Sequence, residues 1–329
     1  MLCSPIDKED QPWRLDLHAN SAFNYSNQQN DYFFIDRDAK ADESLLDIGR
    51  DSYGFKRPTQ WIKMRHLRQF DHYHQPILSK QQQAWQAMLS RCNGELPSAS
   101  YSTLKSIIRK GVPSNLRGRV WMHYSGASKK MEANPDVYSS LVKTAIKMGE
   151  YNEHAEVIQR DLHRTFPDNS NFECAYFVDP EGATVMEPET NSKLQSLRRI
   201  LLAFSIYSPQ IGYCQSLNYL VGLFLLFVNT EEEAFWLLVT TVNDYMPEKM
   251  YDPTMEGVNI DQSVLMMMIY EKIPSIWDKI SNEGKCFWEN NQQEELPHMT
   301  LVTSHWFLTM FINILPIETV LRIWDCFFL

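Results

Sequence analysis

The sequence predicts an all-α fold built from many helices. Apolar residues recur every three or four positions in a succession of segments several turns long, which is the period of an amphipathic helix. Helix-ending residues separate these segments, among them Gly111, Pro167, Pro209 and Pro316. No alternating run of apolar and polar residues is long enough to indicate a sheet. With 44% hydrophobic residues among 329, the chain can form a large core.

Composition argues against several classes of function. Lys and Arg number 31 and Asp and Glu 41, so the formal net charge is −10. Such an acidic chain argues against general nucleic-acid binding and against an electrostatic membrane anchor. The six cysteines are spread without a C-x-x-C pair, which favours a reducing, cytoplasmic setting over a zinc or disulfide framework. We expect no secretory signal, and the longest apolar run, residues 219–228, is too short to cross a bilayer.

Three regions are expected along the chain. Residues 1–50 are rich in Asp, Asn, Gln and Ser, and we expect them to be extended or disordered. Residues 51–104 form a helical N-terminal extension, in which a turn precedes a helical pattern that begins near Trp61. Its histidines lack the H-x-x-x-H spacing of a helical metal site, so no metal is expected. Residues 105–329 form the main domain.

The main domain opens with two helices. The first is expected to end at Lys110, with Gly111 as the residue that closes it, and the second starts after Pro113. Arg117 and Arg119 lie on the second helix. They are either solvated charges or partners of buried acidic groups, and the sequence does not separate the two.

A helix over residues 136–148 precedes one over 151–165, which Pro167 ends. Ile158, Asp161, Leu162 and Thr165 share one face of this second helix. Arg164 lies near its end, where Asp161 could hold the guanidinium through an i,i+3 contact. The pair is either an ordinary solvated ion pair, worth under about 1 kcal/mol, or a cation placed to reach out of the protein.

A second polar cluster precedes the apolar helix expected over residues 217–228. An apolar helix over residues 194–206 stops at Pro209, and Gln215 and Asn218 then lie at the start of the next helix. The amides could bind a ligand at this helix start. Alternatively, Ser216 or Asn218 only caps the helix and makes a buried hydrogen bond.

The remaining helices are expected over residues 234–242, 261–277, 300–315 and 319–329. The three methionines 266–268 are expected to fill the core rather than a binding groove.

An arginine and a glutamine on neighbouring helical segments suit phosphoryl transfer. The arginine can stabilise charge on the transferring group, and a carboxamide can orient the attacking water. The segment with Ile158, Asp161 and Arg164 resembles the I-x-x-D-x-x-R motif of TBC domains, the Rab GTPase-activating proteins. The segment with Tyr213 and Gln215 resembles their Y-x-Q motif. Residues 104–121, 257–262 and 322–325 resemble other landmarks of the family, and the resemblance covers about residues 105–329.

The resemblance implies a GTPase activator that acts on a Rab-family GTPase in vesicle trafficking and is not itself a GTP hydrolase. Arg164 and Gln215 would be the two catalytic fingers, with Asp161, Asn218 and Tyr213 in support. The chain would need no cofactor of its own, because GTP and Mg²⁺ come with the Rab. It would be cytoplasmic, with peripheral recruitment to endomembranes and to membrane-associated complexes.

Two departures from the family pattern stand out. Ser216 occupies a position where glycine is common, and a small residue is expected to be tolerated there. The chain stops soon after Trp324 and Asp325, so the domain is expected to be truncated, with its C-terminal helices missing. Two alternatives are a non-catalytic Rab-binding scaffold of the same fold and a hydrolase that uses Cys214 or Ser216. The hydrolase lacks a G-x-S-x-G motif and a nearby histidine.

Overall fold

The computed structural model describes residues 49–59, 62–98, 103–178, 184–187, 191–281, 287 and 299–329. Residues 47–329 form one compact unit. The expectation that residues 1–50 are extended or disordered falls, except for the last two positions, outside the described residues. Among the described residues, no helix is both long enough and apolar enough to cross a membrane.

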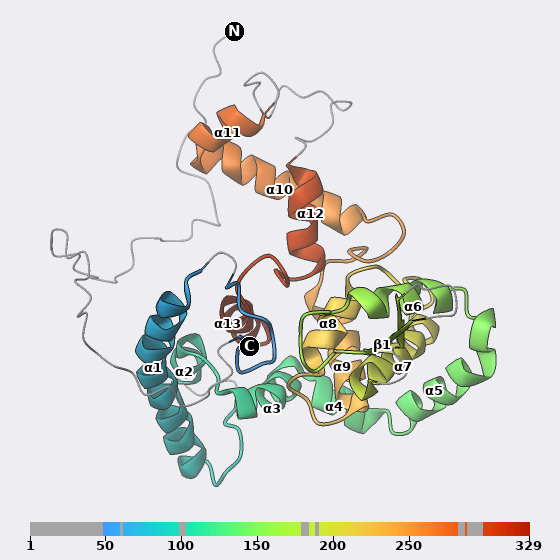
Figure 1. The fold of residues 1–329 in the computed structure, drawn as a ribbon, viewed down its shortest axis with the longest axis horizontal. Coiled ribbons are helices and arrows are strands. Elements are labelled where there is room, and N and C mark those ends of the chain that lie inside the picture. The colour runs from blue at the N-terminus through green and yellow to red at the C-terminus, as the bar shows by residue number, and fades with distance from the viewer. Residues whose placement is uncertain are drawn as a thin grey trace, which may run out of the picture. The chain divides into compact units, whose positions relative to one another are not determined.

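The described part of the chain is helical, as predicted, with thirteen α-helices and one short hairpin (Figure 1). In chain order the helices are α1 (Met64–Arg91), α2 (Leu104–Lys110), α3 (Ser114–Ser125), α4 (Ala127–Ala133), α5 (Val137–Met148), α6 (Ala155–Arg164), α7 (Ser192–Tyr207), α8 (Leu217–Phe224), α9 (Glu231–Thr240), α10 (Glu256–Lys272), α11 (Pro274–Ile280), α12 (Thr300–Leu308) and α13 (Ile317–Phe327). A 3-10 turn, Gly149–Tyr151, precedes α6, and a π-helical turn, Thr241–Tyr245, extends α9.

Helix α7 lies at the centre of the core and contacts α5, α6, α8 and α9. Most of its apolar side chains are almost fully buried, as are most of those of α8 and the last seven residues of α9. A capping box between Thr230 and Glu233 starts α9, because each satisfies a backbone N–H of the other that the helix leaves free. Glu233, one of three acidic residues in the first turn, therefore favours this helix start through a side-chain hydrogen bond.

A buried ion pair joins α3 to α13. Arg117 donates from Nε to Asp325 Oδ1 over 2.9 Å, and both side chains are almost fully buried. Asp325 also accepts from the Val112 backbone N–H and from the Trp121 indole N–H, each over 3.1 Å. Of the two interpretations left open for the arginines, Arg117 is therefore the buried partner of an acid, whereas Arg119 lies at the surface.

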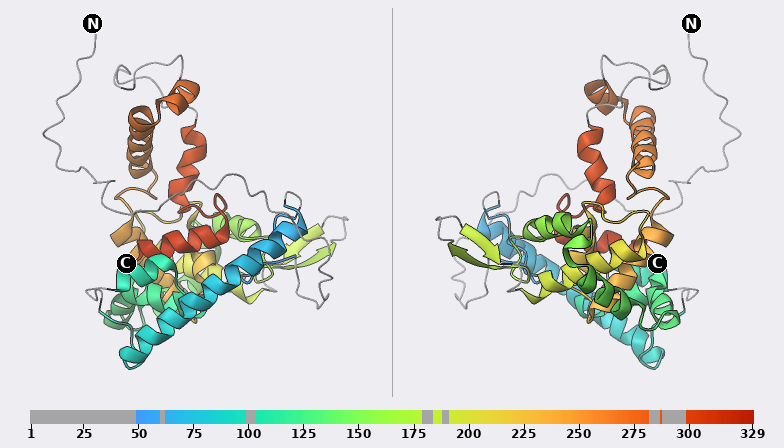
Figure 2. Two further views of the ribbon diagram at one scale, coloured as in Figure 1. Left: turned by 90° about the vertical axis from the view of Figure 1, so that its left-hand side faces the viewer. Right: turned by 90° about the vertical axis from the view of Figure 1, so that its right-hand side faces the viewer.

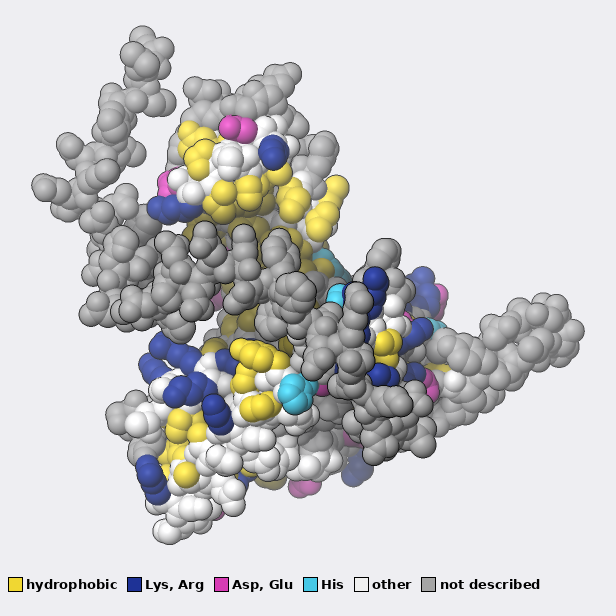
Figure 3. Space-filling model, turned by 60° about the vertical axis from the view of Figure 1, so that its left-hand side comes forward, with side chains coloured by type: hydrophobic (Ala, Val, Ile, Leu, Met, Phe, Trp, Pro, Cys, Tyr) yellow, Lys and Arg dark blue, Asp and Glu magenta, His cyan; other side chains and the backbone are white. Residues whose placement is uncertain are grey.

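Helices α11 and α12 both pack on α10 (Figures 1 and 2). Their outer surface is apolar in places, and Figure 3 shows hydrophobic side chains in its upper part, where these helices lie. The most exposed are Ile260, Val264, Met268, Ile276, Leu301 and Val302. The prediction of a methionine-filled core holds for Met266, which is fully buried, and is wrong for Met268, which is half exposed.

Several predicted boundaries are wrong for physical reasons. The expected 261–277 helix is two helices, because Pro274 starts α11 and Ile273 before it leaves the helical conformation (φ −137°, ψ 64°). The expected 300–315 helix stops at Leu308, because Met310, Phe311 and Asn313 have left-handed φ values.

Other differences concern short elements. Helix α6 begins at Ala155 rather than near residue 151, after the 3-10 turn, and α8 ends at Phe224 rather than at residue 228. Between α6 and α7 the chain forms an antiparallel hairpin of β1 (Ala175–Val178) and β2 (Thr184–Glu187), with Ala175 opposite Glu187 and Val178 opposite Thr184. Four-residue strands are too short to give a readable alternation. Helix α4 was not predicted.

Candidate functional site

Arg164 is the last residue of α6 and points away from the core. The face predicted for this helix is confirmed, because Ile158, Asp161, Leu162 and Thr165 are all buried. The Arg164 side chain in contrast is 46% exposed. The helix stops here because the next residues lead into a proline, with Phe166 in the left-handed region (φ +50°).

A buried carboxylate holds the Arg164 guanidinium. Asp161 is fully buried and receives a short hydrogen bond from Arg164 Nη2 on its Oδ1 atom. Its Oδ2 atom accepts from the Tyr213 hydroxyl over 2.5 Å. Burial, followed by the bond to the Asp161 carboxylate, raises the pKa of Tyr213, so this hydroxyl remains a donor at any physiological pH. Asp161 thus joins the end of α6 to the loop before α8.

A second chain of hydrogen bonds joins the same two segments. The Thr165 hydroxyl donates to the Asp161 backbone oxygen over 2.7 Å and accepts from Asn218 Nδ2 over 2.8 Å. Asn218 Oδ1 in turn accepts from the Ser216 backbone N–H over 3.1 Å. Because the Asn218 amide is fully buried, its two ends fix the loop around Gln215 against α6.

Gln215 is exposed on this fixed loop. Tyr213 and Ser216 on either side of it are anchored to Asp161 and Asn218, whereas the Gln215 side chain lies at the surface. Arg164 and Gln215 are thus exposed side chains on two segments that a buried network ties together.

Ser216 does not cap α8 with its side chain, contrary to one of the two interpretations. Its backbone has φ +118°, a conformation that glycine adopts most readily. A glycine would therefore fit this position at least as well, which accounts for the family preference noted from the sequence. The buried amide hydrogen bond of the same interpretation is present, in Asn218.

Two glycines allow the segments to approach. A Cβ atom on Gly222 of α8 would lie 2.9 Å from Phe166 Cε2 and 3.0 Å from Thr165 Cγ2. A Cβ atom on Gly212 would lie 2.1 Å from His154 Nε2. Sequence reasoning placed Thr165 on the buried face of its helix but assigned no role in the site to Phe166 or Gly222. A glycine inside the most apolar helix was the available signal, because it indicates close approach of another segment.

The structure disfavours the hydrolase alternative. Burial raises the pKa of Cys214 to about 11, so its thiol stays protonated and a poor nucleophile near neutral pH. Ser216 is only 2% exposed, which leaves a substrate little access to its hydroxyl. Among the described residues, no group of three or more His, Cys, Asp and Glu side chains could hold a metal ion.

Comparison with known protein families settles the relationship. Residues 114–329, more than half of the chain, match the model of the Rab-GTPase-TBC domain. The chain belongs to the Rab-GTPase-TBC domain family. Its TBC fold is also that of a solved structure, the flagellar RabGAP TBC domain of Chlamydomonas. That structure is 28% identical with a TM-score of 0.61, and the match covers 85% of this chain and 81% of that one.

Curated TBC relatives are similar over most of the chain. The GTPase-activating proteins GYP3 and MSB4 of Saccharomyces cerevisiae are each 36% identical, over 310 and 298 residues, and both matches cover 84% of this chain. Human growth hormone-regulated TBC protein 1 is 36% identical over 280 residues, with 84% of this chain and 72% of that protein covered. The chain spans 47% of the length of GYP3 and 58% of that of MSB4.

Proposed function

We propose that this chain is a GTPase-activating protein for a Rab-family small GTPase, and that it acts through Arg164 and Gln215. The observation that carries the proposal is the pairing of two exposed polar side chains on segments joined through Asp161 and Asn218. Membership of the TBC family and the names of the yeast relatives support it.

The two fingers have different tasks. Arg164 enters the active site of the GTPase and neutralises charge that develops on the phosphates in the transition state. Gln215 orients the attacking water, since a carboxamide donates and accepts hydrogen bonds at once. Asp161, held by Tyr213, keeps Arg164 near its bound geometry before docking, which lowers the entropy lost on binding. Asn218 does the same for the loop that carries Gln215.

The chain supplies no nucleotide chemistry of its own in this proposal. GTP and Mg²⁺ belong to the partner GTPase, so the chain is an activator and not a GTP hydrolase. Its cellular role is then to end Rab signalling in vesicle trafficking. It would work from the cytoplasm, recruited peripherally to endomembranes where the active Rab resides.

The test is single-turnover GTP hydrolysis on a panel of purified Rab proteins. Arg164→Ala should lower the accelerated rate about 100-fold or more, because an arginine finger contributes about 10³ to 10⁵ in rate. Arg160→Ala is the matched control, since Arg160 lies one turn earlier on α6, is 67% exposed and faces Glu156. It should leave the rate unchanged.

Three results would contradict parts of this proposal. Unaccelerated hydrolysis by every Rab with the wild-type chain would remove the activity altogether. Binding of a GTP-loaded Rab without acceleration would favour the non-catalytic scaffold, and an unchanged rate for Arg164→Ala would exclude Arg164 as the finger.

A further inference from the structure

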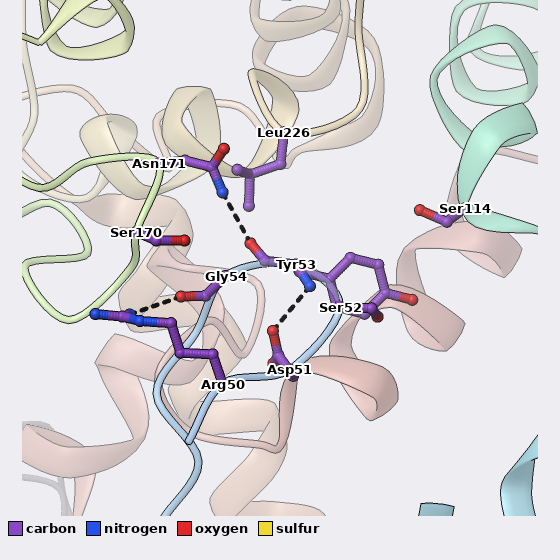
Figure 4. A pocket seen from close by; sticks show the side chains of 9 residues that line it. All are labelled: Arg50, Asp51, Ser52, Tyr53, Gly54, Ser114, Ser170, Asn171 and Leu226. Carbon is purple, nitrogen blue, oxygen red and sulfur yellow. Dashed lines mark hydrogen bonds between the residues drawn. The ribbon is translucent and has the colours of Figure 1, made fainter. Parts of the chain in front are cut away.

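Residues 49–59, here called the N-terminal strap, lie outside the residues matched by the family model. They precede α1, and the family match begins only at residue 114. Nevertheless the strap packs against residues 166–173, the turn that directly follows Arg164. Figure 4 shows this contact, with Arg50, Tyr53 and Gly54 of the strap facing Ser170 and Asn171.

The backbone of the strap is paired with this turn. Phe55 and Asn169 form an antiparallel bridge, and the Ser170 N–H donates to the Gly54 oxygen over 3.0 Å. The Asn169 and Asn171 side chains both donate to the backbone oxygen of Tyr53, over 3.1 and 3.2 Å. The strap is therefore held at several successive residues rather than by one side chain.

Charged contacts add to this pairing. Arg50 donates to the backbone oxygen of Asp168 and forms an ion pair with Glu173. Asp51 accepts from the backbone N–H groups of Tyr53 and Phe55, each over 2.9 Å, which shapes the turn of the strap itself. These contacts place Phe55 opposite the end of α6.

Phe55 completes the set of aromatic side chains that pack around Phe166. The two rings meet edge to face with centroids 5.1 Å apart and an interplanar angle of 87°. Phe166 is 4% exposed, has φ +50°, and also packs on Phe172 and on Tyr219 of α8. A phenylalanine in the left-handed region is held there only by its surroundings. Removing the Phe55 ring takes away the packing on one side of Phe166, which lies two residues after Arg164.

We propose that the N-terminal strap is a positioning element for Arg164, in which Phe55 fixes the backbone turn that sets the direction of the guanidinium. This inference rests on the proposed function, because it assigns the strap to the same site. It predicts that residues outside the family-matched region control the rate of hydrolysis rather than the binding of the GTPase.

The first experiment compares Phe55→Ala with Lys56→Ala, an exposed neighbour in the same strap, on the Rab that responds best to the wild-type chain. At saturating activator, Phe55→Ala should lower the single-turnover rate by about 10-fold to 100-fold, because small misplacement of a catalytic group has effects of this size. The half-saturating concentration should change less than about twofold. Lys56→Ala should match the wild type in both.

A double-mutant cycle tests whether Phe55 acts through Arg164. In the Arg164→Ala background, Phe55→Ala should have no further effect on the rate, because the group that it positions is gone. A further equal loss in that background would show a general structural role and overturn the inference. Phe55→Tyr should restore most of the rate, since it keeps the ring.

Amide hydrogen exchange tests the inference in two variants without the GTPase. Amide hydrogen exchange over residues 162–172 should rise in Phe55→Ala and not in Lys56→Ala, while exchange in α7 stays as in the wild type. Gly54→Ala should have the same effect, because its Cβ would lie 2.6 Å from Ser170 Oγ at φ +90°.

The outcomes separate the two proposals. No acceleration by the wild-type chain on any Rab removes the proposed function, and the strap inference with it. Acceleration by the wild type together with an unchanged maximal rate in a folded Phe55→Ala variant overturns the strap inference alone.

Discussion

At the scale of single residues, the site depends on one carboxylate. Asp161 is fully buried, and a buried charge is costly unless its lone pairs are satisfied. Its donors come from Arg164 and from Tyr213, 52 residues away in the chain. Because the Arg164 side chain is 46% exposed, solvent screens the ion pair, so we expect it to contribute orientation more than stability.

The thiol beside Gln215 gives a prediction that depends on pH. Burial raises the pKa of Cys214 to about 11, so the thiolate fraction should increase tenfold per pH unit from pH 7 towards that value. Alkylation of Cys214 by iodoacetamide, followed by mass spectrometry, should be slow at pH 7 and accelerate through pH 10. The exposed Cys326 is the control for reagent access. Fast labelling of Cys214 at pH 7 would contradict the raised pKa of its thiol.

At the scale of elements, α6 and α8 can meet because α8 carries no side chain at the point of contact. A Cβ atom on residue 222 would lie only 2.9 Å from the Phe166 ring. The hydrogen bonds between Thr165 and Asn218 run beside this contact. Gly222 therefore helps to hold together the two segments that carry Arg164 and Gln215.

Gly222→Ala tests this contact, because the substitution has two effects of opposite sign on the stability of the protein. Helix propensity alone would stabilise α8 by up to about 1 kcal/mol. The clash with Phe166 and Thr165 should outweigh it and destabilise the protein by about 1–3 kcal/mol. Urea unfolding of the variant and the wild type measures the difference, and an increase in the free energy of unfolding would refute the close approach.

The sequence predicts those features that are determined by neighbouring residues in the chain, and not those that depend on distant residues. Helix α2 ends at Gly111 and α7 ends before Pro209, as predicted, because those residues act on their own backbone. The buried face of α6, with Asp161, also follows from spacing alone. The hydrogen bond from Tyr213 to Asp161 and the packing around Phe166 do not follow from the sequence, because they depend on tertiary contacts between distant segments. The roles proposed for Arg164 and Gln215 came from family motifs and stay predictions.

At the scale of the whole domain, the ends of the family-matched region are tied by Arg117 and Asp325. The two residues lie 208 positions apart and are buried, and the Trp121 indole N–H donates to Asp325. The Arg117 guanidinium also lies 5.3 Å from the centre of the Phe227 ring. The helix nearest the C-terminus is thereby part of the same core as α3.

Asp325→Asn should therefore destabilise the whole domain. It leaves the Arg117 charge buried without its counter-ion, which costs about 3–5 kcal/mol. The free energy of unfolding in urea measures the loss. Glu95→Gln is the control, since it breaks an exposed ion pair with Arg119 whose two side chains are 46% and 84% exposed. The control should change stability by less than about 1 kcal/mol, and equal losses would show that burial of the pair is not the cause.

The ion pair at the end of α6 also affects how the domain meets an anionic partner. A guanidinium next to a carboxylate has no net charge, so its field decays faster with distance than that of a lone cation. Beyond a Debye length of about 8 Å at physiological ionic strength, Arg164 then attracts a nucleotide only weakly. In the proposed complex its charge would act only on contact, where the phosphates would compete with Asp161 for its donors. The cation would thus discriminate among complexes already formed and contribute little to how often they form.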